Sequence, residues 1–138
     1  MGETLTMSRF VRPDVIVLPL PSGGDTVSLK KRLTTGENRA MYARMYKSGV
    51  TPWTLDPSAT LVSQVAAYLA DWTLVDDSGV KVEIRGKSPE EITEILDALD
   101  PDSFTEIKDL VLVHIEVQDA LREDEKKTDT GTKEPSVT

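Results

Sequence analysis

Two cap-and-proline signals constrain the fold of this chain more than any other feature of its sequence. Ser88-Pro89-Glu90-Glu91 places a capping serine before a proline at the first helical position, and its second glutamate completes a capping box. Asp100-Pro101 repeats the cap-then-proline signal further along the chain. These signals predict two successive helices, and apolar residues at helical spacing in the first are Ile92, Ile95, Leu96 and Leu99.

The second of these helices, predicted over residues 100–122, carries a wide apolar arc. One face is formed by Phe104, Ile107, Val111 and Ile115. An adjacent face is formed by Leu110, Val113, Val117 and Leu121. An arc of this width indicates a helix that is either central in the core or carries a side that faces a partner.

Two further helices precede these. Thr34 or Thr35 caps a helix that runs to about Lys47, with Glu37 near the positive end of its dipole. The second is predicted from Ser58 to Trp72, where a single apolar face is made by Leu61, Val65, Tyr68, Leu69 and Trp72.

Sequence patterns typical of strands lie before the first predicted helix and between the later ones. Residues 15–18 are β-branched or aliphatic and residues 26–30 alternate in polarity, so with the turn Ser22-Gly23-Gly24-Asp25 they predict an antiparallel hairpin. Residues 80–85 also alternate and predict a third strand, with Leu74 pairing into the same sheet before the turn at residues 76–79. The expected fold is α+β, a small antiparallel sheet packed by about four helices.

The 138-residue length predicts a single domain. Residues 1–12 are polar and aperiodic and form a flexible lead-in, and residues 13–122 form the α+β domain. Residues 123–138 contain no aromatic residue, which predicts a disordered acidic and polar tail. No apolar run approaches the roughly 20 residues of a membrane-spanning helix, so we expect no membrane partner.

The composition argues against catalysis. The chain has no cysteine and only one histidine, which excludes thiolate chemistry and a histidine metal cluster. His114 lies in an apolar stretch, where a hydrogen-bonded, half-buried histidine is expected rather than a ligand or base. We predict no enzyme activity, no cofactor and no metal site.

Charge is divided unevenly along the chain, whose net charge is −8. Residues 1–56 have a net charge of +3 and residues 57–138 a net charge of −11. One modest basic patch is predicted from Lys30, Lys31, Arg32, Arg39, Arg44 and Lys47. The overall acidity opposes nucleic-acid binding and suits a basic or polar partner.

Three stretches resemble a known family when they are taken in order. They are residues 27–37 (VSLKKRLTTGE), residues 65–74 (VAAYLADWTL) with the Asp77-Ser78-Gly79 turn, and residues 95–101 (ILDALDP). This order is similar to the tail assembly chaperones of long-tailed bacteriophages, whose genes lie just upstream of the gene for the tape-measure protein. The likeness spans about Val27 to Ala120.

The resemblance implies a non-enzymatic role in the cytoplasm of a bacterial host. Such proteins are thought to coat the long helical tape-measure protein while the tail tube polymerises, and to be absent from the mature virion. Many of their genes also give a longer frameshifted product, for which Lys126-Lys127 lies at the expected place. Self-association, or association with that longer form, is part of the same expectation.

A chaperone for an extended helical client needs an apolar groove beside a charged surface. We expect residues 100–122 and the helix over residues 58–72 to form this groove, near Tyr68, Trp72, Phe104 and Ile107. Core packing is the competing role for each of these four side chains. The alternative functions are a structural subunit of the tail or head–tail connector, and an acidic adaptor or inhibitor that binds a basic host protein.

Overall fold

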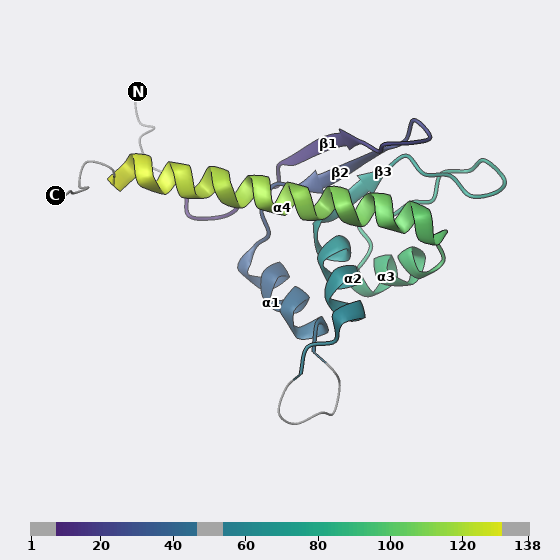
Figure 1. Cartoon of the computed structure of the whole chain (residues 1–138), viewed down its shortest axis with the longest axis horizontal. Coiled ribbons are helices and arrows are strands. Elements are labelled where there is room, and N and C mark those ends of the chain that lie inside the picture. The colour runs from purple at the N-terminus through teal and green to yellow at the C-terminus, as the bar shows by residue number, and fades with distance from the viewer. Residues whose placement is uncertain (1–7, 47–53, 131–138) are drawn as a thin grey trace.

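The computed structural model describes residues 8–46 and 54–130 and has the predicted α+β fold (Figure 1). Its elements follow in the order β1 (Val15–Pro19), β2 (Thr26–Lys30), α1 (Thr35–Arg44), α2 (Pro57–Tyr68), β3 (Leu69–Trp72), α3 (Pro89–Asp97) and α4 (Pro101–Thr130).

The first two strands form the predicted antiparallel hairpin, in which Val17 lies opposite Ser28. Gly23 and Gly24 adopt positive φ angles of 80° and 74° in the connecting turn, a conformation that favours glycine. Strand β2 is central in the sheet, and its alternate residues Val27 and Leu29 are fully buried. The sheet therefore has one face packed on the core, as its alternating sequence predicts.

The third strand is not the one that the sequence predicts. Residues 69–72 leave the helical path and pair antiparallel with β2, so the helix predicted to Trp72 ends at Tyr68. This pairing satisfies the backbone groups on the second edge of β2, which a longer helix would leave unpaired. Residues 80–85 form only an isolated bridge, between Val75 and Lys81. Val82 N–H does donate to the carbonyl of Leu74, so these segments meet across their turn but outside the sheet.

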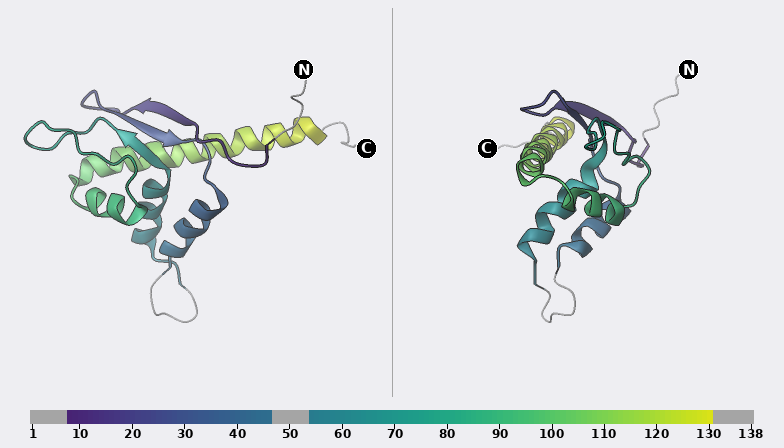
Figure 2. Two further views of the ribbon diagram at one scale, coloured as in Figure 1. Left: turned by 180° about the vertical axis from the view of Figure 1, so that it is seen from behind. Right: turned by 90° about the vertical axis from the view of Figure 1, so that its right-hand side faces the viewer.

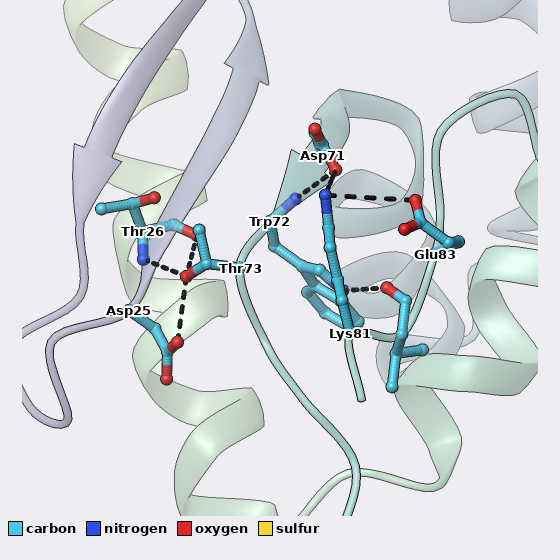
Figure 3. A network of polar contacts seen from close by, with 8 residues as sticks. Asp25, Thr26, Asp71, Trp72, Thr73, Lys81 and Glu83 are labelled. Carbon is cyan, nitrogen blue, oxygen red and sulfur yellow. Dashed lines mark hydrogen bonds and ion pairs between the residues drawn. The ribbon is translucent and has the colours of Figure 1, made fainter. Parts of the chain in front are cut away.

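Side chains fix the end of β3 against both neighbouring loops (Figure 3). Thr73 accepts from the backbone N–H of Thr26 and donates to the carboxylate of Asp25, both over 2.9 Å. The indole of Trp72 donates to the Val82 carbonyl over 2.8 Å. An ion pair of 3.2 Å between Lys81 and Asp71 ties the same loop to the strand. These contacts position the loop after β3 without making it part of the sheet.

The helices begin where their caps predict. Thr34 caps α1 in a capping box with Glu37, although α1 ends at Arg44 rather than at about Lys47, a residue outside the described ranges. Ser88 caps α3 through the predicted capping box. Asp100 accepts from the backbone N–H groups at the start of α4. Asp56 caps α2, so this helix begins at Pro57, one residue before the prediction.

Helix α2 is the centre of the helical layer, since it contacts α1, α3 and α4. Figures 1 and 2 show α1, α2 and α3 on one side of the sheet, with α4 running alongside it. The C-terminal part of α4 extends past α1 and past the end of the sheet. Residues 123–126 in this part of the helix are all exposed.

Helix α4 continues to Thr130, past Glu123, where the sequence predicts the disordered tail to begin. Glu and Lys, which recur in residues 123–127, propagate an existing helix well. Residues 131–138 lie outside the described residues, as do residues 1–7 of the predicted lead-in; residues 8–12 contain neither helix nor strand.

Candidate functional site

Helix α4 has a buried face and an exposed apolar face at neighbouring positions. Ile107 and Val111 are 0% exposed and pack in the core. Val113, Val117 and Leu121 are 57%, 48% and 50% exposed, and the half-buried Leu110 precedes them. We call Leu110, Val113, Val117 and Leu121 the outer stripe. The helix is thus both central in the core and uncovered on one side, the two alternatives that its wide apolar arc predicts.

Two polar contacts tie α4 to the sheet. His114 is buried and its Nε2 atom lies 2.8 Å from the carbonyl oxygen of Lys30, so the prediction of a hydrogen-bonded histidine is confirmed. Its ring meets that of Tyr68 edge-on at a centroid distance of 6.0 Å. Glu106 accepts from the hydroxyl of Ser22, in the β1–β2 turn, over 2.6 Å. The outer stripe is therefore carried on a helix whose orientation is fixed on its other side.

The four predicted contact residues do not form one surface. Tyr68, Trp72 and Ile107 belong to the buried core, so for these three the competing role of core packing is the one the structure supports. Phe104 is half-buried and lines an open apolar concavity of about 480 Å³ between α2, α3 and the first turn of α4. Its other lining residues are Ser58, Ala59, Val62, Thr93, Leu96, Asp97, Leu99 and Pro101. Of the four predicted residues, this concavity contains Phe104 alone, and α3 contributes to its lining together with α2.

A second concavity, of about 760 Å³, is basic. Its lining includes one acid, Asp14, and five cations drawn from the N-terminal segment, the β2–α1 loop and α4: Arg9, Arg12, Lys31, Arg32 and Arg122. Sequence reasoning misses this grouping because the contributing segments are far apart in the chain. Only Lys31 and Arg32 come from the basic patch that the sequence predicts.

Two other members of that patch differ in their surroundings. Lys30 forms a 2.9 Å ion pair with Glu37 and lines a smaller concavity of about 270 Å³ together with Arg12 and Arg32. Arg44 lies 3.9 Å from Glu90, and its Nε and Nη2 atoms are buried without a hydrogen-bond partner. Lys30 therefore adjoins the basic concavity, whereas Arg44 is not among the residues that line it.

The shifted pKa values mark caps and core rather than a reactive cleft. Burial acts to raise the pKa of Glu37, but the N–H of Thr34 and the ammonium group of Lys30 outweigh it and hold that pKa below its ordinary value. Hydrogen bonds from Ser88 lower the pKa of Glu91, and burial raises the pKa of Tyr68. Each shift is explained by a structural role.

Within the described residues, no three acidic or histidine side chains are grouped so as to hold a metal ion. The same part of the chain contains no helix with the length and apolar character needed to cross a bilayer. Comparison with protein-family models, curated proteins and solved structures found no match to this chain. The outer stripe and the Phe104 concavity are the best-defined apolar surfaces of the candidate site.

Proposed function

We propose that this protein is a non-enzymatic phage tail assembly chaperone that binds and solubilises the tape-measure protein during tail morphogenesis. The observation that carries the proposal is the outer stripe, an apolar face left uncovered on a helix that extends beyond the folded body. The order of the three stretches that resemble the family supplies the identity of the client. In this proposal the protein acts in the host cytoplasm, leaves the client again and is absent from the mature virion.

The outer stripe suits weak and reversible binding. Burying an aliphatic side chain completely contributes about 1.5–3 kcal/mol, so covering the exposed halves of Val113, Val117 and Leu121 contributes roughly 3 kcal/mol. The client side chains that cover the stripe are buried at the same time and contribute a similar amount, whereas association costs about 4 kcal/mol or more in lost rigid-body freedom. One stripe therefore holds one client segment weakly, and a long client is held by many copies that each dissociate readily.

Co-expression with the tape-measure protein tests the proposal. We expect the tape-measure protein to become soluble and to co-purify with the wild-type protein. The variant Val117→Glu should lose most of this effect. The matched control is Val80→Glu, which makes the same change at a 62% exposed valine in the turn after β3 and should behave as wild type.

Other outcomes point to the alternative functions. An insoluble client, together with rings of this protein or its retention in purified virions, would replace the chaperone by a structural subunit. Salt-sensitive capture of a basic host protein, with no effect on the tape-measure protein, would favour the acidic adaptor or inhibitor. If Val117→Glu and Val80→Glu lose solubilisation equally, the outer stripe is not the surface that binds the client.

A further inference from the structure

We infer that the outer stripe accepts a single amphipathic helix of the client whose apolar seam is flanked by lysine or arginine. The inference rests on the proposed function in taking the partner to be helical, and it adds the chemistry by which that partner is recognised. Its basis is the position of charges around the outer stripe.

The outer stripe has the spacing of a helix-packing seam. Leu110, Val113 and Val117 are separated by three and then four residues, the alternation by which two helices pack nearly parallel or antiparallel along their length. From Leu110 to Leu121 the seam is about 16 Å long at 1.5 Å per residue. This length matches about three turns of one partner helix.

Acidic side chains border this seam. Asp109 precedes Val113 by four residues, Glu116 follows it by three, and Asp124 follows Leu121 by three, so each is a neighbour of the seam on the helix surface. All three are exposed. Between residues 109 and 125 α4 carries six acids and one base, Arg122, which pairs with Asp119. Lys108, 3.2 Å from Asp109, and Lys126, two residues after Asp124, offset part of this charge, and residues 108–126 remain negative with six acids and three bases.

This charge pattern selects among possible occupants. A second copy of α4 would bring the same acidic border against the first, and like charges across a helix seam oppose pairing. A client helix with acidic borders meets the same repulsion. Asp109 and Glu116 lie on one side of the seam, and its other side carries the buried Val111 and His114. A helix with basic residues beside its seam places opposite charge against these two acids, which favours both diffusional encounter and one alignment of the two helices.

Three synthetic helical peptides test the inference. They share one apolar seam with three-and-four spacing and differ only in flanking residues, which are Lys, Gln or Glu. We expect the full-length protein to bind the Lys-flanked peptide about tenfold more tightly than the Glu-flanked one at low salt, and this preference to shrink by several fold at about 0.5 M salt. Fluorescence anisotropy of the labelled peptides measures both quantities.

Substitutions in α4 and elsewhere test which acidic side chains cause the preference for the Lys-flanked peptide. Glu116→Gln with Asp124→Asn should reduce the preference for the Lys-flanked peptide several-fold. Glu83→Gln with Glu94→Gln removes the same charge from exposed sites outside α4 and should leave the preference unchanged. Val117→Glu should weaken all three peptides, and circular dichroism establishes that each variant is folded. Equal binding of the Lys- and Glu-flanked peptides, or an equal effect of both charge-removing pairs, would overturn the inference.

The result separates this inference from the proposed function. If the tape-measure protein is solubilised but the peptides show no preference for basic flanks, the chaperone function is supported and the inference about basic residues in the client helix is wrong. If the Lys-flanked peptide binds but the tape-measure protein stays insoluble, the outer stripe is a binding site for a helix with basic flanks, and its client is another protein. Sedimentation should find the same oligomeric state for the wild-type protein and Val117→Glu. A dimer that Val117→Glu dissociates would assign the seam to a second copy and overturn the inference.

Discussion

The two faces of α4 predict that one substitution, valine to alanine, is destabilising at one of two nearby positions and nearly neutral at the other. Val111 is 0% exposed and Val113 is 57% exposed, and both lie within α4. Replacing Val111 by alanine removes about 1.6 kcal/mol of burial, at roughly 0.8 kcal/mol per methylene-sized group, and the cavity adds about 1 kcal/mol. The better helix propensity of alanine returns about 0.5 kcal/mol. The expected net loss is about 2 kcal/mol.

Val113→Ala should be nearly neutral, because the smaller burial loss and the propensity gain are both about 0.5 kcal/mol. An unfolding entropy of about 2.1 cal/mol/K per residue over roughly 115 residues converts 2 kcal/mol into a fall of about 8 °C in Tm. Thermal and urea unfolding of both variants measure these quantities. If Val113→Ala is as destabilising as Val111→Ala, the outer stripe is covered in solution and the reasoning about a free surface is refuted.

Three further substitutions test individual contacts. Trp72→Phe removes the indole donor and leaves the Val82 carbonyl without it, so urea unfolding should show a loss of about 2 kcal/mol. Glu37 has a lowered pKa and stabilises the fold only while ionised, so the stability difference between wild type and Glu37→Gln should be present at pH 7 and shrink as the pH falls below the ordinary value of 4.5. Arg44→Met should leave Tm unchanged or raise it, because it removes two buried, unpartnered nitrogen atoms; a clear fall would reveal a stabilising contact of the guanidinium.

Helix starts could be predicted because each depends on a few consecutive residues. The Ser88 capping box closes within three residues, since Glu91 Oε1 accepts from Ser88 N–H over 2.9 Å and Ser88 Oγ accepts in return from Glu91 N–H over 3.2 Å. Thr34 and Glu37 form the same arrangement. Such contacts are visible in the sequence because no other part of the chain takes part in them.

The third strand could not be predicted because pairing with β2 decides it. Val65, Leu69 and Trp72 have helical spacing, and no glycine or proline separates them, so the local pattern continues the helix. The structure uses Leu69 and Trp72 instead to bury side chains from a strand opposite Leu29 and Val27. A pairing over more than 40 residues of chain leaves no local signal of this kind.

The candidate site was predictable to a similar extent. The apolar arc of α4 identified the outer stripe, because helical spacing places Val113 and Val117 on one face whatever the rest of the chain does. Which arc faces the core depends on the packing of the other elements. Sequence reasoning therefore points to Tyr68, Trp72 and Ile107, which are core residues, together with Phe104, which lines the concavity.

The direct passage from α2 into β3 has a consequence for how the chain folds during synthesis. Strands β1 and β2 emerge from the ribosome first, yet a two-stranded hairpin is marginal alone and its third strand and covering helix come later. At about 5–20 residues per second, the interval between Leu29 and Trp72, the last residue of β3, lasts roughly 2–9 s. During this time the second edge of β2 has no strand to pair with. Because α2 continues directly into β3, the helix at the centre of the helical layer and the strand that completes the sheet become available together.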